Sequence, residues 1–553
     1  MHRPFALLII LLLIAVCYGQ CLFFDFLNWD DPSHFLDNPS VQSLSPKNIL
    51  EIFRTTVDQI YIPLSVLSHA VEHHFFSFNP MIYHFHNILL HIGVTILVFF
   101  FGRQCGLTEN ASLIAALIFG IHPMHVESVT WVTERKGMLY ALLYMASLCA
   151  YGSYLKRKKF TLYGISLLCG ILSILAKPTA LSLPLVLFVC DWIHNRKINI
   201  RILAEKLPFF LYSGAIAWIT FVLVYNRIPV ENFSKGALVW IWTFSFYIFQ
   251  FFLPSRLSLI YPIPEPISLG NPAYLFSVIL VAILAGGLMI LKSRRWHMIA
   301  LLLYFFQIFF LLRFNDKTGV NVVADRFMYL PSLGFCLLLG YLFDSLITAS
   351  NDPEHFRQNK AAKAAVILYL GALSIMTFIQ VQVWKNDMTL WSSVLRINPH
   401  CDIAYHNRGY AFMQKGQYAL ALSDFQRALD LNPRRPETYN NRGMIFAKLG
   451  QSQKALAEFE KALLIQPGSS AVFINRGNLY RDEGKLSGAI KEYDRVLHLP
   501  ETDPLMRALA YAEKAYALYL KEDPAAALQH IGQALAIFPD LDKALKYRAL
   551  INR

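Results

Sequence analysis

The chain has 553 residues, of which 55% are hydrophobic and only 16% are charged. Soluble domains carry about 25% charged residues, so this composition excludes a protein that is soluble and globular throughout, and the apolar content excludes a disordered chain. Lys and Arg number 50 against 37 Asp and Glu, which gives a net charge of +13. In a soluble protein this excess would indicate nucleic acid. Here it fits basic cytoplasmic loops and anionic lipid head groups better, and we expect no nucleic-acid partner.

Apolar segments long enough to cross a bilayer begin at the N-terminus and recur to about residue 383. Arg3 precedes about twenty apolar residues, which favours a span over a cleaved signal peptide. With this segment the pattern predicts about eleven spans. The other ten lie near 80–102, 108–121, 137–155, 160–176, 180–193, 207–225, 274–291, 297–313, 330–348 and 364–383.

Basic loops predict how the spans are oriented. The run Lys156–Lys159 and the pair Arg196–Lys197 mark cytoplasmic loops. All basic loops fall on the cytoplasmic side only if the aromatic segment 237–253 does not cross the membrane. We therefore expect this segment to be re-entrant or interfacial. The C-terminal part then lies outside the cytoplasm. We expect a multi-pass protein of a bacterial inner membrane or of the endoplasmic reticulum, with residues 1–383 as its membrane domain.

Residues 384–553 are polar and charged, and they repeat every 34 residues. Pro399, Pro433 and Pro467 keep this spacing, as do the Asn-Arg-Gly triplets that start at 407, 441 and 475. This is the period of the tetratricopeptide repeat (TPR). The pattern predicts an all-α protein whose C-terminal domain is a solenoid of about four repeats, with 385–398 as a leading half-repeat and 541–553 as a cap. Such a stack forms a groove for a peptide or protein partner, and a scaffold without a ligand is the alternative.

Two neighbouring carboxylates follow the first span. Asp30 and Asp31 stand between Trp29 and Pro32, on the predicted outer face. Adjacent like charges raise one of the two pKa values, which makes the pair a candidate general base or metal ligand. An Asx-type turn before Pro32 is the structural alternative.

Histidine-rich segments come next. His69, Glu72 and His73 have the H-x-x-E-H spacing of some metalloproteases, a short pattern that chance often produces. Polar residues in or beside later spans indicate an active site at the water–lipid boundary, or buried side chains with satisfied hydrogen bonds. They are His84, His91, His122, His125, Glu127 and Tyr329.

Several cations fall on the predicted outer side, where the orientation of the spans does not require them. Scattered cations are tolerated there, but together they would hold an anionic phosphate at the membrane face. For Arg326, a salt bridge to Asp325 or Glu127 is the structural alternative. The cations are Arg135, Lys136, Lys177, Lys317 and Arg326.

These motifs, in this order and followed by the repeats, resemble the transmembrane and TPR-containing O-mannosyltransferases and their prokaryotic relatives. The resemblance implies a GT-C-like fold for residues 1–383. It also implies transfer of a hexose, with mannose as the first expectation, from a polyprenyl-phosphate-linked donor to Ser or Thr hydroxyls of proteins. The matching pieces are Asp30–Asp31 with Asn38–Pro39, Pro63–Leu64, Asn79–Pro80 with His84, Asn87 and His91, His122–Pro123 with His125 and Glu127, Lys177, and 324–335 with Tyr329.

The resemblance further implies roles for single residues. Asp30 or Asp31 would be the catalytic carboxylate, acting as a base or holding a divalent cation. Arg326, Lys177 and Arg135 would hold the lipid phosphate, and the TPR groove would bind the protein acceptor. Two other functions stay open: a non-catalytic, membrane-anchored TPR scaffold and, third, an intramembrane metalloprotease.

Overall fold

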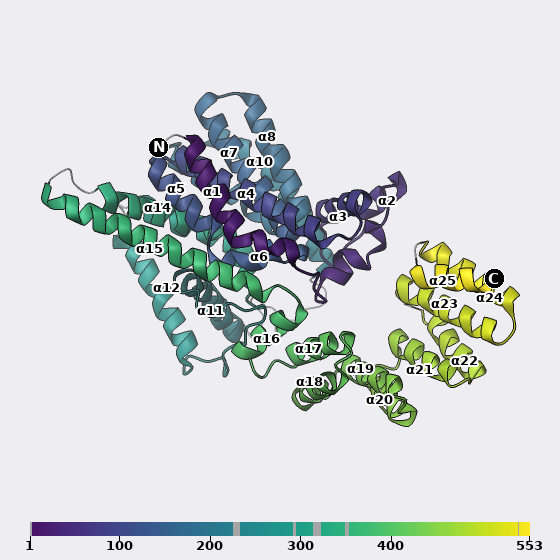
Figure 1. Ribbon diagram of the computed structural model, residues 1–553. Helices are drawn as coiled ribbons and strands as arrows, with labels where there is room; N and C mark the ends of the chain where they lie inside the picture. The colour runs from purple at the N-terminus through teal and green to yellow at the C-terminus, as the bar shows by residue number, and fades with distance from the viewer. Residues whose placement is uncertain are drawn as a thin grey trace. The chain divides into compact units, whose positions relative to one another are not determined.

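The structure, a computed structural model, describes residues 3–224, 233–290, 295–312, 322–348, 353–500, 502–539 and 541–552. Within these ranges the chain is helical and contains no β-sheet, which confirms the all-α prediction. Contacts divide it into two compact units, residues 1–398 and 399–553. Figure 1 traces the helices of both units.

The first unit contains helices α1 to α16. Prolines begin several of them, because proline lacks the N–H that the first helical turn leaves unpaired anyway. Asn79 adds a cap to α4 by accepting a hydrogen bond from the N–H of Met81. The helices are α1 Arg3–Tyr18, α2 Pro46–Ile52, α3 Pro63–Phe76, α4 Pro80–Cys105, α5 Glu109–Gly120, α6 Val126–Thr130, α7 Arg135–Arg157, α8 Phe160–Ala176, α9 Leu183–Ile193, α10 Ile200–Val224, α11 Phe233–Phe252, α12 Pro272–Ile290, α13 Arg295–Ile308, α14 Leu333–Thr348, α15 Pro353–Val383 and α16 Asp387–Ile397.

Every predicted span contains an apolar helix where the chain is described, but the expectation of about eleven full spans is wrong. Among the described residues, five helices are long and apolar enough to cross a membrane. A sixth counts if α5 and the segment Pro123–Thr130, which meet at a bend of 50°, form one span. The five are Phe5–Phe23, Pro80–Cys105, Val132–Arg157, Ile200–Ile219 and Lys360–Val383.

In the remaining five apolar helices the segment that counts as a candidate span has only 10–17 residues, and in α12 it is Pro272–Gly287. A helix of 17 residues is about 26 Å long, which is less than the roughly 30 Å of a hydrocarbon core. Composition reveals an apolar run, but it does not show where the helix starts. Pro178 and Pro272 begin two of the short segments and so limit their length.

Some orientation predictions stay untested. The aromatic segment 237–253 forms α11 and is not among the five long helices, and its position relative to a bilayer stays a prediction. Residues 225, 291 and 313, at the ends of predicted spans, and the cation Lys317 lie outside the described residues.

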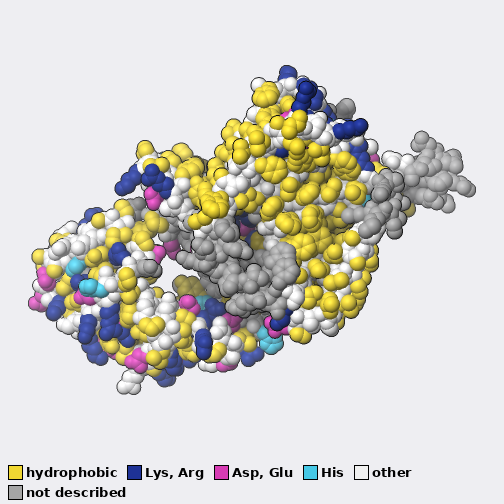
Figure 2. Space-filling view, turned by 180° about the vertical axis from the view of Figure 1, so that it is seen from behind, with side chains coloured by type: hydrophobic (Ala, Val, Ile, Leu, Met, Phe, Trp, Pro, Cys, Tyr) yellow, Lys and Arg dark blue, Asp and Glu magenta, His cyan; other side chains and the backbone are white. Residues whose placement is uncertain are grey.

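A broad hydrophobic surface covers much of the first unit, and Lys and Arg side chains gather at one end of it (Figure 2). Phe160, Ile200 and Leu368 are each more than 70% exposed. A soluble protein rarely exposes so much contiguous apolar surface, whereas a lipid bilayer solvates it. The first unit is therefore that of a membrane protein.

The second unit is a stack of helix pairs followed by one more helix. Gly416, Gly450 and Gly484 end the first helix of three successive pairs with φ of +71°, +70° and +74°, a conformation that glycine adopts without strain. Their spacing of 34 residues repeats the sequence period. The helices are α17 Asp402–Gln414, α18 Tyr418–Leu431, α19 Pro436–Lys448, α20 Ser452–Ile465, α21 Ser470–Asp482, α22 Leu486–Leu497, α23 Pro504–Leu520, α24 Pro524–Ile537 and α25 Asp542–Ile551.

Residues 385–398, expected as a leading half-repeat of the solenoid, lie in the first unit instead. They contain α16, whose Trp391 packs edge-on against Trp29 with 5.2 Å between the ring centroids. The N–H of Asn28 donates to the Asp387 carboxylate at 2.9 Å. These contacts attach α16 to the segment that carries the Asp30–Asp31 pair.

Candidate functional site

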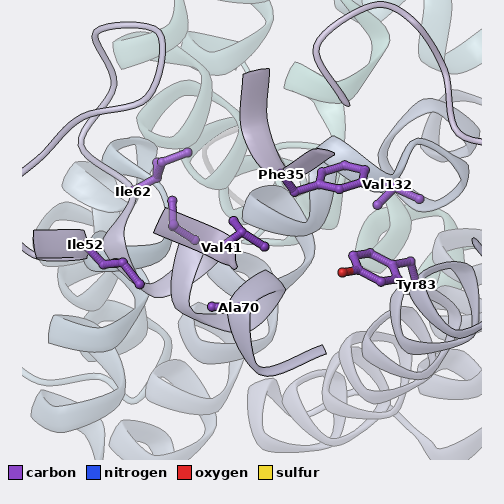
Figure 3. Packing of buried hydrophobic residues seen from close by; sticks show 8 residues of the cluster. Phe35, Val41, Ile52, Ile62, Ala70, Tyr83 and Val132 are labelled. Atoms are coloured by element: carbon purple, nitrogen blue, oxygen red, sulfur yellow. The ribbon is translucent and has the colours of Figure 1, made fainter. Parts of the chain in front are cut away.

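Apolar packing holds the segment that follows the first span, residues 24–62, against the helices. The cluster joins this loop to α3, to α4 and to the residues just before α7, and Figure 3 shows its side chains converging. Burying one such side chain contributes about 1.5–3 kcal/mol, so the loop is a packed part of the unit. The cluster consists of Phe35, Val41, Ile52, Ile62, Val66, Ala70, Tyr83 and Val132.

Asp31 is a buried carboxylate that joins two backbone segments. Its side chain accepts hydrogen bonds from the N–H of Leu27 at 2.8 Å and from the N–H and hydroxyl of Thr133 at 3.2 and 2.5 Å. Burial raises the pKa of Asp31 to about 6, although these three donors favour the charged form. With its oxygens committed to these donors, Asp31 has a structural role.

Asp30 has a different environment. It is half-buried, and its carboxylate accepts no hydrogen bond from the part of the chain that the structure describes. Its backbone carbonyl accepts the N–H of His34 at 3.0 Å, which sets the turn after it. Burial raises the pKa of Asp30, while the positive charges of Lys136 and Arg326 oppose this rise. Asp30 is therefore available to accept a proton.

A charged cluster lies near Asp30, and we define it as Lys136, Lys177, Arg326, Glu127 and Glu134. Lys177 Nζ is 2.8 Å from Glu134 Oε2, and Lys136 Nζ and Arg326 Nε are 3.7 and 3.6 Å from Glu134 Oε1. Arg326 Nη1 also pairs with Glu127, which accepts the backbone N–H of Arg326 at 3.2 Å. Three cations thus share two carboxylates, which leaves positive charge to balance Asp30 or an anionic ligand.

Arg326 forms the salt bridge that was its structural alternative, and its partner is Glu127 rather than Asp325. Asp325 instead accepts the Tyr261 hydroxyl at 2.7 Å. Burial and the nearby charge of Glu127 raise the pKa of Asp325 well above its usual range. Within the described ranges Nη2 of Arg326 donates no hydrogen bond, so a phosphate oxygen would share this guanidinium with Glu127.

Arg135, expected at the phosphate, lies elsewhere. It is 2% exposed, pairs with Glu72 at 2.7 Å, donates to the Tyr83 carbonyl at 2.8 Å and also donates to the Asn87 side chain. Successive side chains on a helix are rotated by about 100°, so Arg135 and Lys136 at the start of α7 point to different neighbours. The sequence analysis named both cations as possible phosphate ligands and the resemblance selected Arg135, because only the helix phase distinguishes the two.

Glu134 lies at the centre of the charged cluster, although the resemblance assigned it no role. It is 1% exposed and lies between the three cations. A β-carbon on Gly137 would lie 2.6 Å from Glu134 Oε2, so this glycine leaves room for the carboxylate. Three consecutive charged residues, 134–136, in an otherwise apolar segment were the signal that could have revealed it.

Three of the predicted histidines make hydrogen bonds within the core. His91 lies 2.6 Å from the Tyr329 hydroxyl and 2.9 Å from the Gly120 carbonyl. His122 is 2.9 Å from the Phe251 carbonyl. His125 is 2.7 Å from the Phe119 carbonyl and 3.0 Å from the Ser332 hydroxyl. This arrangement matches the structural alternative for these three residues, whereas His84 is buried with its ring edge-on to Phe24.

The H-x-x-E-H segment also contributes to packing. His69 lies 3.6 Å from Glu72, and its ring contacts those of Phe35 and Tyr83, which also contact each other. Burial would raise the pKa of Glu72, but Arg135 and His69 lower it to about 2. In the described ranges no three His, Cys, Asp or Glu side chains are grouped so that they could hold a metal ion.

Comparison with protein families confirms the repeats. Residues 409–450 match the family described as TPR repeat, and residues 436–469 and 474–544 match tetratricopeptide repeat families. Among solved structures, the TPR protein YrrB aligns with 29% of this chain and 81% of its own, at 23% identity and a TM-score of 0.24. The pilus biogenesis factor PilW aligns with 33% and 89%, at 18% identity and a TM-score of 0.24.

Comparison with curated proteins confirms the family resemblance. The chain is 25% identical to human protein O-mannosyl-transferase TMTC4, covering 74% of this chain and 64% of that protein. It is 24% identical to human TMTC3, covering 75% and 50%, and 23% identical to Tmtc3 of Drosophila melanogaster, covering 75% and 54%. The chain thus spans about half to two thirds of the length of the curated relatives it matches.

Proposed function

We propose that this protein is a membrane glycosyltransferase that moves a hexose, mannose in the first instance, from a polyprenyl-phosphate-linked donor to Ser or Thr hydroxyls of a protein on the extracytoplasmic face. The observation that carries the proposal is Asp30, a half-buried carboxylate near the positive charges of Lys136 and Arg326. The names of the relatives support the sugar and the protein acceptor.

The reaction needs one base and one site for negative charge. Asp30 takes the proton of the acceptor hydroxyl, and the oxygen of that hydroxyl forms a bond to C1 of the sugar. The bond between C1 and the phosphate oxygen breaks, and its electron pair leaves on the polyprenyl phosphate. Lys136, Lys177 and Arg326 stabilise that growing charge, because fixed cations at a membrane boundary interact strongly with an anion.

The residues around Asp30 do not fit a divalent cation. Such ions take several oxygen ligands, whereas here one available carboxylate lies near the positive charges of Lys136 and Arg326, and the Asp31 carboxylate already accepts hydrogen bonds from Leu27 and Thr133. We therefore derive no step through a metal.

The TPR unit supplies the acceptor site in this proposal, on the same extracytoplasmic side as Asp30. A groove of about 520 Å³ within this unit is lined by Asn475, Asn478 and Arg481 together with Glu513. Amide side chains bond an extended peptide backbone without regard to its sequence, which suits an enzyme with varied acceptors.

Transfer by the purified full chain in liposomes tests the proposal. Radiolabelled polyprenyl-phosphate mannose and a Ser/Thr-rich peptide are the substrates, and label in the peptide is the readout. We expect transfer by the wild type and by Asp37→Asn, an exposed carboxylate in the same loop, and at least a hundredfold loss for Asp30→Asn. Full transfer by Asp30→Asn, or none by the wild type with any polyprenyl-phosphate sugar, would overturn it and favour the scaffold.

A further inference from the structure

A second cavity lies at the far end of α7 from the charged cluster. It is a groove of about 540 Å³ between the C-terminal ends of α4 and α7. Because α7 rises 1.5 Å per residue from Arg135 to Arg157, the groove is about 30 Å from the charged cluster along the helix axis. Its lining includes Phe100, Arg103 and Gln104 from α4 and Ser153, Lys156 and Arg157 from α7.

The two walls of the groove are held together by a polar side chain. The amide of Gln104 donates to the Cys149 carbonyl at 3.0 Å and to the Ser153 hydroxyl at 2.9 Å. A β-carbon on Gly152 would lie 2.5 Å from Gln104 Oε1, so this glycine admits the amide. The groove is therefore fixed by contacts between the helices before any ligand binds.

The cations of the groove have no acidic partner in the part of the chain that the structure describes. Lys156 donates to the Gln104 carbonyl at 3.1 Å and Arg103 to the Leu107 carbonyl, both uncharged acceptors. Arg157 is exposed and makes neither a hydrogen bond nor an ion pair in the described ranges. Three positively charged side chains around one groove thus have no acidic partner in the described ranges.

Two other cations near this end of α7 are paired. Arg196 lies 2.8 Å from Asp191 and 2.7 Å from Glu205, and Lys206 lies 2.6 Å from Asp191. Orientation in the membrane and the helix dipole account for basic residues at a helix end. They do not account for three unpaired cations around a preformed groove with an apolar wall.

We propose that this groove binds the phosphate headgroup of an anionic phospholipid. Arg and Lys side chains bind phosphate oxygens, and basic pockets between membrane helices are typical sites for such headgroups. Leu97 and Phe100, on the same wall as Arg103, accept the start of an acyl chain. The Lys and Arg side chains in Figure 2 border a hydrophobic surface, as a site at the edge of a bilayer requires. The site does not depend on the proposed transferase activity.

Lipid binding to the full chain in neutral detergent micelles tests the proposal. The probes are phosphatidylserine, phosphatidylcholine and inorganic phosphate, and native mass spectrometry counts the bound lipid. The variant Lys156→Gln/Arg157→Gln removes two charges from the groove. The matched control Lys158→Gln/Lys159→Gln removes two charges from adjacent residues that do not line it. A thermal melt checks the fold, and Arg103→Gln repeats the test from the other wall if the double variant fails to fold.

We expect the wild type to prefer phosphatidylserine over phosphatidylcholine at least tenfold. The groove variant should lose at least tenfold in phosphatidylserine affinity, while the control changes less than twofold. Equal loss in both variants would show a non-specific surface charge effect and overturn the site. Binding of inorganic phosphate as tight as that of the lipid would also overturn it, because the apolar wall would then contribute nothing.

Discussion

The charged cluster and the TPR unit are both held by buried or half-buried ion pairs, but the paired residues are separated very differently along the chain. In the TPR unit the same pair recurs in three repeats, always with its partner sixteen residues later. In the cluster, Lys177 and Glu134 are 43 residues apart, and Arg326 and Glu127 are 199 apart. The repeated pairs are Arg408–Asp424, Arg442–Glu458 and Arg476–Glu492.

This difference shows how each region depends on the rest of the fold. A TPR pair needs only its own helix pair, so losing one repeat contact leaves the neighbouring ones in place. The charged cluster forms only when α6, α7 and the segments before α9 and α14 pack against one another. We therefore expect single substitutions to act strongly and specifically around the cluster and weakly in the repeats.

The largest effect on stability should come from Arg135→Ala. Removing one partner of a buried ion pair leaves Glu72 unpaired, which typically costs about 3–5 kcal/mol. The melting temperature of the purified protein measures this loss. The TPR residue Arg476 is the matched control, and Arg476→Ala should cost less, because its partner Glu492 keeps an ion pair with Arg495 at 3.4 Å. Equal losses would remove the contrast between the two regions.

The same pair predicts a dependence on pH. The folded-state pKa of Glu72 is about 2, below the value of about 4.3 expected in an unfolded chain. Its stabilisation is therefore fully present above pH ~4.3 and is lost as the pH falls toward 2. Glu72→Gln should lower stability at neutral pH and flatten this part of the profile, as acid titrations of both proteins would show.

The next largest effect concerns Asp30 and Asp31. Substitution of the first should change turnover, and substitution of the second should change stability. Asp30→Asn should lower turnover at least a hundredfold and leave the melting temperature nearly unchanged. Asp31→Asn should cost about 1–3 kcal/mol of stability, because it disturbs the bonds to Leu27 and Thr133. Since the pKa of Asp30 is raised, wild-type turnover should fall on acidification at a higher pH than an exposed Asp would require. Unchanged turnover in both variants would exclude the pair from the reaction.

A smaller effect is expected where two TPR helices cross. A β-carbon at Gly443 would lie 2.5 Å from the Phe459 ring, so Gly443→Ala should destabilise by about 1–3 kcal/mol through overpacking. The fragment 399–553 is the protein to melt, because its helix pairs pack on their neighbours and should unfold cooperatively alone. Gly532→Ala, with open space around the added methyl, is the control. A fragment without a cooperative helical melt would contradict the independence of the repeats.

The smallest effect should be a change of one cation for another. Arg326→Lys keeps the charge beside Glu127 but loses the Nη2 donor, so it should weaken donor-lipid binding by about 1–2 kcal/mol with little change in melting temperature. Arg326→Ala should weaken binding more and also lower stability. Wild-type lipid affinity in folded Arg326→Ala protein would leave Arg326 with a structural role alone.

Much of the architecture was readable from the sequence, because it follows from properties of short segments. The 34-residue period predicted the TPR pairs, and apolar runs predicted eleven helices of the first unit, although not α2, α3, α6, α11 or α16. The position of Asp30 outside the first span was readable in the same way. Full span lengths were not, because prolines such as Pro178 divide apolar runs that composition treats as continuous.

The composition and the spacing of residues determined the all-α fold, the membrane character of the first unit, the repeats of the second and the candidate carboxylates. Only the tertiary structure decided that Asp31 has a structural role, as an acceptor of hydrogen bonds from Thr133. It also decided that Lys136 rather than Arg135 joins Lys177 and Arg326 around Glu134. The physical reason is that contacts across tens to hundreds of residues depend on helix phase and on the packing of several helices. Neither quantity is a property of any short stretch of sequence.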